Sequence, residues 1–314
     1  MDKMVNWLVI GVGDITKKRV LPAILAHKRS ELRGIVTRSP EKASPYGCNV
    51  YPSLDVALRD KEIDAVYVGT PVALHAPQAT EALQAGRHVL CEKPMAMNYP
   101  EAMDMVSCAR DSGRLFGVAY YRRLYPKLRR AKELVQAGAI GQPVLCEANS
   151  HSWVPPGIEG DYWRFDPALA GGGPLYDIAS HRIDAMNYLF GNPTRATGFV
   201  SNAVHQYAVE DNATVLMEYA GGIRGTVDVR WHSRVDRDEF RIIGTDGAIE
   251  MSSLNSGRLV WPGGSEDLPP HTNLHYPLIE HFVDCILDGT TLISSGETAL
   301  WTDWVTAKVA MRLS

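Results

Sequence analysis

The sequence lacks the features of a disulfide-rich, membrane-spanning or nucleic-acid-binding protein. Its five cysteines are dispersed and form no C-x-x-C pair, so we expect neither a disulfide framework nor a zinc ribbon. No uninterrupted apolar run reaches about 18 residues, and the N-terminus lacks the pattern of a signal peptide. The net charge is only −4, from 32 basic and 36 acidic residues, which does not favour a nucleic-acid partner. We expect a cytoplasmic protein without a membrane segment.

The composition is that of an ordinary globular protein. Hydrophobic residues make up 45% of the 314 residues and charged residues 22%, which leaves material for a sizeable core. A chain of this length predicts about two domains.

The strand and helix patterns change near residue 122. Before it, short apolar runs at residues 7–10, 32–36, 65–68, 88–91 and 115–119 alternate with helical stretches, which predicts a parallel sheet covered on both faces. After it, strand-like runs dominate, at residues 144–148, 195–203, 214–219, 225–231 and 239–243. Glycine turns separate several of them, which predicts a mostly antiparallel sheet. One helix, over residues 174–190, interrupts this region. We therefore expect an α/β nucleotide-type domain over residues 1–122 and an α+β domain over residues 123–314. The last helix could pack back on the first domain.

A glycine turn separates the first expected strand from the first helix, with the sequence Gly11-Val12-Gly13-Asp14-Ile15-Thr16. In a dinucleotide-binding fold, the first glycine allows the tight turn and the second lets the backbone approach a pyrophosphate. Thr16 stands where the fingerprint has its third glycine, so the motif is incomplete. We expect cofactor contacts from Gly11, Gly13, Asp14 and Ile15.

The second expected strand ends at Thr37-Arg38-Ser39. An acidic residue there would bind the ribose hydroxyls of NAD(H), whereas an arginine accepts the 2′-phosphate of NADP(H). The acidic residue is missing and Arg38 is present. We therefore predict contacts from these three residues and a preference for NADP(H), with NAD(H) also possible. The alternative is that Arg38 is an ordinary solvated side chain.

Three further segments are distinctive. The first combines Gly69-Thr70-Pro71-Val72-Ala73-Leu74-His75 with the later run Ala85-Gly86-Arg87-His88-Val89-Leu90-Cys91-Glu92-Lys93-Pro94. The others are Trp163-Arg164 and the run from Gly171-Gly172-Gly173 to Asp184. Together they resemble the Gfo/Idh/MocA family of nicotinamide-dependent sugar and cyclitol oxidoreductases. The resemblance implies a Rossmann domain, followed by a domain whose large open sheet commonly supports oligomers.

The resemblance also implies the catalytic residues. Lys93 is assigned to the active site, where it polarises the substrate oxygen, and His181 is the acid/base. Asp177 binds substrate hydroxyls or supports the histidine. At helical spacing, Asp177, His181, Asp184 and Tyr188 share one stripe, and a histidine beside carboxylates suits proton transfer. The role of Asp184 stays open between orienting the histidine and capping a loop.

Other site residues follow from the same segments. We expect cofactor contacts from Thr70, Pro71, His75, Glu92 and Lys93, and substrate contacts from Tyr121, Trp163, Arg164 and Asp177. For Tyr121 and Arg123, a packing role or an ion pair is an equal alternative. His271, His275 and His281 have a spacing that invites a metal, but loop and cap roles fit better, so we expect no metal.

These observations favour an oxidoreductase. It would transfer a hydride between NADP(H) or NAD(H) and a carbonyl or secondary alcohol of a sugar, cyclitol or related polyol. The alternatives are a non-catalytic dinucleotide-sensing regulator on the same fold, or a dihydrodiol dehydrogenase. The expected partners are the small-molecule substrate and further copies of the chain, in a homodimer or homotetramer.

Overall fold

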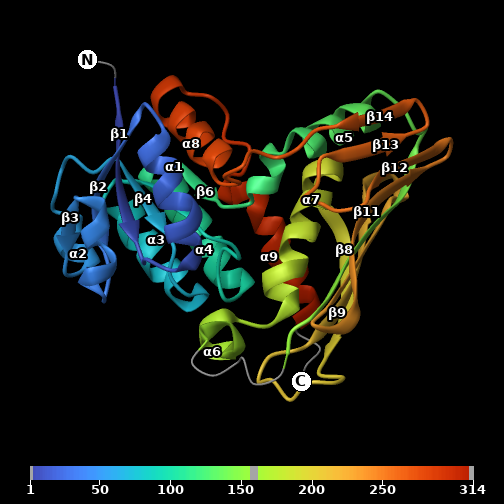
Figure 1. Cartoon of the computed structure of the whole chain (residues 1–314), viewed down its shortest axis with the longest axis horizontal. Coiled ribbons are helices and arrows are strands. Elements are labelled where there is room, and N and C mark those ends of the chain that lie inside the picture. The colour runs from blue at the N-terminus through green and yellow to red at the C-terminus, as the bar shows by residue number, and fades with distance from the viewer. Residues whose placement is uncertain (1–2, 156–161, 311–314) are drawn as a thin grey trace. The chain divides into compact units, whose positions relative to one another are not determined.

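The computed structural model describes residues 3–155 and 162–310 (Figure 1). The chain forms two compact units. Unit 1 comprises Met1–Tyr121 and His271–Leu300, and unit 2 comprises Arg122–Pro270 and Trp301–Ser314. The sequence places residues 271–300 in the second domain, but they group with unit 1. The physical reason is that α8 (Tyr276–Asp288) packs against β1 (Val5–Ile10), where the rings of Phe282 and Trp7 lie 5.7 Å apart.

Unit 1 contains a six-stranded parallel sheet in the order β3-β2-β1-β4-β5-β6, which confirms the predicted α/β class. The other strands are β2 (Ser30–Val36), β3 (Asn49–Tyr51), β4 (Ala65–Val68), β5 (His88–Cys91) and β6 (Phe116–Val118). The helices are η1 (Thr16–Val20), α1 (Leu21–Ala26), α2 (Leu54–Ala57), α3 (His75–Gln84), α4 (Tyr99–Ser112) and α8. Short turns are η2 (Pro40–Lys42), η3 (Ser44–Tyr46) and η4 (Val72–Leu74). This strand order is that of a dinucleotide-binding fold.

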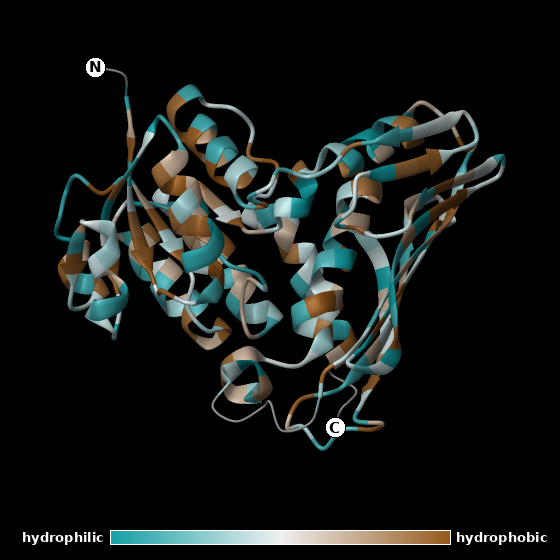
Figure 2. Ribbon diagram, in the orientation of Figure 1, coloured by the Kyte–Doolittle hydropathy of each residue, from teal (hydrophilic) through white to brown (hydrophobic). Residues whose placement is uncertain are grey.

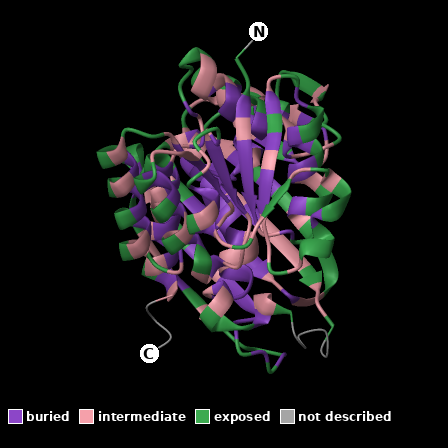
Figure 3. Ribbon diagram, turned by 90° about the vertical axis from the view of Figure 1, so that its left-hand side faces the viewer, coloured by how far each residue is buried: buried purple, intermediate pink, exposed green. Residues whose placement is uncertain are grey.

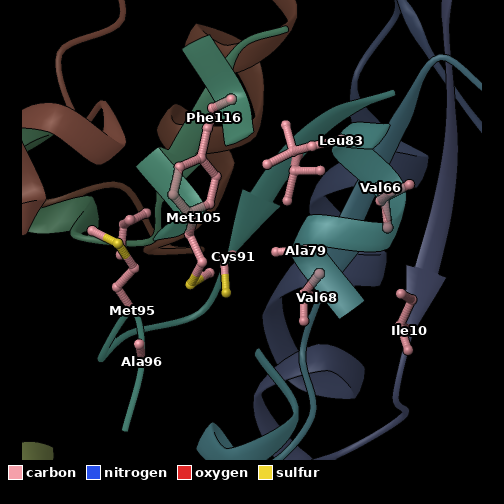
Figure 4. Packing of buried hydrophobic residues seen from close by; sticks show 14 of the residues in the cluster. Ile10, Val66, Val68, Ala79, Leu83, Cys91, Met95, Ala96, Met105 and Phe116 are labelled. Atoms are coloured by element: carbon pink, nitrogen blue, oxygen red, sulfur yellow. The ribbon is translucent and has the colours of Figure 1, made fainter. Parts of the chain in front are cut away.

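Four strands of unit 1, β1, β4, β5 and β6, are largely buried on both faces. Every residue of β4 is buried, as a parallel sheet between two helical layers requires (Figure 3). Apolar residues accordingly predominate along these strands (Figure 2). Val66, Val68 and Leu83 pack with Cys91 and Met105 in the core between the sheet and α3 and α4 (Figure 4).

Unit 2 is built on an eight-stranded sheet in the order β14-β13-β12-β11-β7-β10-β9-β8, antiparallel except for the pair β7 and β10. The strands are β7 (Pro143–Trp153), β8 (Pro193–Ser201), β9 (Asn212–Tyr219), β10 (Arg224–Arg230), β11 (His232–Gly244), β12 (Gly247–Met251), β13 (Arg258–Trp261) and β14 (Gly264–Asp267). The helices and turns are η5 (Tyr121–Leu124), α5 (Pro126–Gln136), η6 (Trp163–Phe165), α6 (Pro167–Ala170), η7 (Leu175–Ala179), α7 (Ser180–Phe190) and η8 (Ala220–Gly222). The last helix, α9 (Gly296–Ala310), begins in unit 1 and ends in unit 2.

The two faces of the second sheet differ. On β10, Val227 and Val229 are buried towards η7 and α7, whereas Thr226 and Asp228 alternate with them and are only half-buried. The opposite face carries the exposed side chains of Phe199 on β8 and Leu216 on β9. The sheet therefore covers a core on one side and leaves the other side open.

Three further properties concern the described part of the chain. All five cysteines are free thiols. No helix within it combines the length and apolarity needed to cross a membrane. Within the same residues, no group of three or more His, Cys, Asp and Glu side chains is placed to hold a metal ion.

Candidate active site

The glycine turn after β1 contains one glycine that the fold requires and one that it does not. Gly11 has a φ of +85°, and a Cβ there would lie 2.8 Å from the Gly69 carbonyl oxygen. Gly13 is exposed, and an added Cβ would meet only the Gly69 oxygen, at 4.0 Å. The protein's own packing thus leaves the space beside Gly13 open, as expected where a pyrophosphate approaches the backbone.

The missing third glycine is compensated from another strand. Thr16 is buried, and its Oγ1 would lie only 2.7 Å from a Cβ added to Gly69, the residue that follows β4. Because residue 69 has no side chain, the helix carrying Thr16 packs closely against the sheet. The glycine that the fingerprint has on the helix is therefore replaced by a glycine just after the neighbouring strand.

The helix after the turn offers backbone donors at its N-terminus. It begins at Asp14, and the Lys17 amide donates to the Gly13 carbonyl at 3.0 Å. The amides before Lys17, including those of Asp14 and Ile15, precede the first intrahelical bond and favour an anion. The Asp14 carboxylate forms an exposed ion pair with Lys18 at 2.8 Å.

The loop after β2 lies beside this turn, because β1 and β2 are parallel neighbours and the Gly11 amide donates to the Val36 carbonyl at 2.9 Å. Thr37 Oγ1 accepts a hydrogen bond from the Ser39 amide at 3.1 Å, which fixes a tight bend. Arg38 stands exposed between them. Arg38 lies at the carboxyl end of β2, and in a dinucleotide-binding fold residues at this position contact the adenosine ribose.

His75 links the ends of β4 and β5. It is buried, with Nδ1 2.9 Å from the Pro94 carbonyl oxygen and Nε2 2.9 Å from the Thr70 carbonyl oxygen. Burial lowers the pKa of the imidazole, although the two carbonyl contacts act in the opposite direction. Both ring nitrogens are engaged within the protein, so we interpret His75 as a support for Thr70 and the Lys93-Pro94 turn.

Lys93 follows β5, half-buried, and its peptide bond to Pro94 is cis. The Lys93 amide donates to Glu92 Oε2 at 3.2 Å. Glu92 Oε1 accepts a hydrogen bond from the Tyr67 hydroxyl at 2.5 Å and lies 3.2 Å from His275 Nε2. Burial raises the pKa of Glu92, but the His275 and Tyr67 contacts outweigh it and lower that pKa to about 2. Both carboxylate oxygens thus have partners within unit 1.

The helix predicted over residues 174–190 is not a regular α-helix. Its first part, η7, is a π turn in which the Ser180 amide donates to the Leu175 carbonyl. Asp177 lies in this turn with its side chain 26% exposed, and His181 is buried just after it. Single π turns in helices are frequent at functional sites.

Close packing against Glu210 explains Gly173, and a left-handed backbone conformation explains Gly171. A Cβ on Gly173 would lie 2.1 Å from the Glu210 carbonyl oxygen, and Gly171 has a φ of +83°. The buried Glu210 carboxylate accepts a hydrogen bond from the Leu175 amide at 3.0 Å. Glu210 therefore caps the turn that carries Asp177.

Arg164 lies beside Asp177. Its Nε is 3.9 Å from Asp177 Oδ1, and its guanidinium stands 5.4 Å from the centre of the Trp163 ring. The structure thus brings together three of the residues predicted to contact substrate, all within unit 2.

Tyr121 and Arg123 have partners that fit the packing alternative. The Tyr121 ring lies 4.7 Å from the ring of His275. Arg123 forms two hydrogen bonds with Asp184, at 2.9 and 2.5 Å, and Thr302 Oγ1 lies 3.4 Å from the same carboxylate. Both oxygens of the Asp184 carboxylate accept hydrogen bonds in this ion pair. The pair therefore favours a structural role for Asp184, in which it holds α7 in place, over a role in proton transfer.

Three supporting residues were missed by the sequence reasoning: Tyr67, His275 and Glu210. Tyr67 lies within an otherwise aliphatic strand, and its hydroxyl could have indicated a buried hydrogen-bond partner. For His275 the sequence predicted a loop or cap role instead of a metal site, and Glu210 lies in a loop without a motif. The cofactor and substrate roles of the residues described above stay predictions.

Comparison with known proteins identifies the family. Residues 5–120 match the model of the oxidoreductase family with an NAD-binding Rossmann fold, and residues 128–250 match the GFO/IDH/MocA C-terminal domain. A dTDP-3,4-didehydro-2,6-dideoxy-alpha-D-glucose 3-reductase from Actinomadura kijaniata is 31% identical, over 78% of this chain and 74% of that protein. The chain belongs to the Gfo/Idh/MocA family, and it is a nicotinamide-dependent oxidoreductase with an NAD-binding Rossmann domain.

Two other relatives align over nearly the whole chain. A 1,5-anhydro-D-fructose reductase from Ensifer adhaerens is 29% identical, over 95% of this chain and 93% of the relative. The crystal structure of an aldose-aldose oxidoreductase from Caulobacter crescentus, complexed with glycerol, superposes with a TM-score of 0.87. It is 26% identical and covers 99% of both chains.

Proposed function

We propose that this oxidoreductase acts on a carbonyl or secondary alcohol of a sugar, cyclitol or related polyol. The observation that carries the proposal is the setting of Lys93. This lysine stands at the carboxyl edge of the parallel sheet, on the same edge as the glycine turn, and its amide is held by Glu92. In open α/β sheets, ligands bind at this edge. The names of the relatives, which are reductases of sugars or sugar derivatives, agree with it.

The residues around the glycine turn suit a nicotinamide dinucleotide. The open space at Gly13 and the amides of Asp14 and Ile15 would hold the pyrophosphate. Thr70 and Pro71, at the end of β4, would border the cofactor on the next strand. When bound, the nicotinamide supplies or accepts the hydride.

The remaining chemistry concerns one oxygen atom of the substrate. In reduction that oxygen gains a proton, and in oxidation it loses one. His181 would exchange this proton as the acid/base, and the Lys93 ammonium would polarise the same oxygen. Asp177 and Arg164, which lie within 3.9 Å of each other, would bind the neighbouring hydroxyl groups.

A panel of substrates tests the proposal. We would follow nicotinamide absorbance with 1,5-anhydro-D-fructose, D-xylose and myo-inositol, in the direction that each allows. We expect the wild type to turn over at least one of these substrates and Lys93→Met to turn over none. Cofactor binding without turnover of any sugar or polyol would favour the dinucleotide-sensing regulator, and turnover of a cyclic dihydrodiol alone would favour the dihydrodiol dehydrogenase.

For the cofactor, we propose a preference for NADP(H). The exposed Arg38 guanidinium would pair with the 2′-phosphate, in a bend that lacks a repelling carboxylate. A charge-assisted contact is worth about 1.5–3 kcal/mol, or about 10–150-fold in affinity. Titration with NADPH and NADH measures this ratio. Arg38→Ala should erode it, whereas Arg59→Ala, at another exposed arginine, should not; equal binding of both cofactors by the wild type would end the proposal.

We also propose that the chain forms a homodimer or homotetramer through the open face of the second sheet. On that face, 72% of Phe199 and 45% of Leu216 are exposed on adjacent strands, an unfavourable arrangement for a monomer. Light scattering at micromolar concentration should give a multiple of the monomer mass. Phe199→Glu should reduce that mass, and a monomeric wild type would contradict the proposal.

A further inference from the structure

A buried polar network lies behind Lys93, and the proposed chemistry does not use it. Its members come from three places in unit 1: Tyr67 from β4, Glu92 from the end of β5, and His275 from the residue before α8. The relative exposure is 0% for Tyr67 and 2% for His275, and the Glu92 side chain is 14% exposed. The contacts to Glu92 Oε1 measure 2.5 Å from the Tyr67 hydroxyl and 3.2 Å from His275 Nε2.

The network ends at the backbone of Lys93, the residue with the proposed catalytic role. Glu92 uses its other oxygen, Oε2, to accept the Lys93 amide at 3.2 Å. A buried carboxylate is costly unless its oxygens have donors. Tyr67 and His275 supply donors to Oε1, so that Oε2 remains directed at the backbone of Lys93.

We propose that His275 and Tyr67 are positioning residues, which keep Glu92 ionised and in place and thereby fix the lysine that follows it. This inference rests on the proposed role of Lys93. It adds that a network outside the reacting groups keeps Glu92 from limiting the acid side of the kcat/KM profile.

The surroundings of Glu92 agree with this role. The titratable groups near it are Tyr67 and Cys91 from the sheet, Lys93 beside it, His275, His75 from α3, and Tyr121, whose ring packs on His275. Burial raises the pKa of Glu92, but the contacts with His275 and Tyr67 lower that pKa to about 2. The carboxylate therefore stays ionised throughout the neutral and mildly acidic range.

His275→Phe removes the donor while keeping a ring against Tyr121. Burial then has less opposition, the pKa of Glu92 rises, and protonation weakens the hydrogen bond that Glu92 accepts from the Lys93 amide. We expect kcat to fall by between about tenfold and about a hundredfold. The acid limb of the kcat/KM profile should move up by about one pH unit or more. The fastest sugar of the panel above serves as substrate.

Two variants separate positioning from simple packing. His275→Gln keeps an N–H donor and should restore most of the acid limb. His271→Phe alters an exposed histidine of the same loop, whose ring stacks on Tyr276 at 4.8 Å, and should leave rate and profile unchanged. Tyr67→Phe removes only one hydroxyl and should move the limb in the same direction as His275→Phe.

A second measurement does not depend on turnover. Glu92 has a lowered pKa in the folded protein, so its contribution to stability is present above the unfolded value and is lost as the pH falls through the folded one. The stability difference between wild type and His275→Phe, measured by urea unfolding, should therefore shrink between about pH 5 and about pH 3.

The outcomes separate this inference from the proposed function. If Lys93→Met keeps full turnover, the proposed function fails. If Lys93→Met is inactive but His275→Phe and Tyr67→Phe keep the wild-type acid limb, only the inference is overturned. A stability difference that stays constant from about pH 5 to about pH 3 also overturns it.

Discussion

The buried ion pair between Arg123 and Asp184 should respond differently depending on which partner is removed. The side chains are only 2% and 1% exposed, and two hydrogen bonds of 2.9 and 2.5 Å join them. Asp184→Asn leaves the Arg123 guanidinium buried without its counter-charge, and an arginine does not lose its proton. We expect a loss of about 3–5 kcal/mol in the free energy of unfolding at neutral pH.

Arg123→Met leaves the buried Asp184 carboxylate without Arg123, and this carboxylate can become neutral by taking up a proton. Burial already raises the pKa of Asp184, although Arg123 opposes that shift. Without Arg123 the pKa rises further, and the carboxylate takes up a proton instead of staying charged. Because this folded-state pKa lies above the unfolded value, stability falls as the pH rises through the interval between them. The loss should be about 1–3 kcal/mol at neutral pH and smaller at acidic pH.

Urea unfolding followed by tryptophan fluorescence suits this comparison. Of the seven tryptophans, all except Trp7 lie in unit 2, which also holds the ion pair. Arg59→Met, which breaks the exposed pair with Asp55, is the control and should leave the midpoint unchanged. A loss below about 1 kcal/mol for Asp184→Asn, or a pH-independent loss for Arg123→Met, would refute the reasoning.

The other predictions concern catalysis, a helix cap and a buried lysine. His181→Ala should lower kcat by about a hundredfold or more, with cofactor affinity unchanged within several-fold in a binding titration. Glu210→Ala should destabilise unit 2 by about 1–2 kcal/mol in urea because the Leu175 amide loses its cap, and Glu210→Gln should recover most of that loss. Burial lowers the pKa of Lys127 to about 8, so stability should rise with pH above that value. Lys127→Met should abolish the rise, and a rise that persists would implicate another group.

The sequence predicts the central strands β4 and β5 well because almost all of their residues are apolar. The expected strands at residues 65–68 and 88–91 coincide with β4 and β5. β3 (Asn49–Tyr51) was not predicted, because it is a three-residue edge strand whose first two residues are exposed and which has no apolar pattern. β11 extends well before the predicted residues 239–243, since the irregular pairing between His232 and Arg237 hides its period.

In the site, features formed within one stretch of chain could be predicted, whereas features formed by residues far apart in the sequence could not. The glycine turn and the segment around Lys93 are visible in the sequence because each lies within one stretch of chain. The replacement of the third glycine by Gly69 is not visible, since it depends on Thr16 meeting a residue 53 positions later. The partner of Asp184 could not be found from the sequence for the same reason, because Arg123 precedes it by 61 residues.

Only part of the network behind Lys93 could have been predicted from the sequence. Once β4 and β5 are taken as parallel neighbours, Tyr67 pairs with Leu90, and the Glu92 amide bonds to the Val68 carbonyl at 2.9 Å. Sheet order therefore brings Tyr67 close to Glu92, and a hydroxyl in a fully buried strand needs a partner. No such rule leads to His275, because its loop reaches Glu92 only through the packing of α8 on unit 1. The sequence offered only a loop or cap role for His275, whereas its burial and the Glu92 carboxylate facing it support the positioning role proposed above.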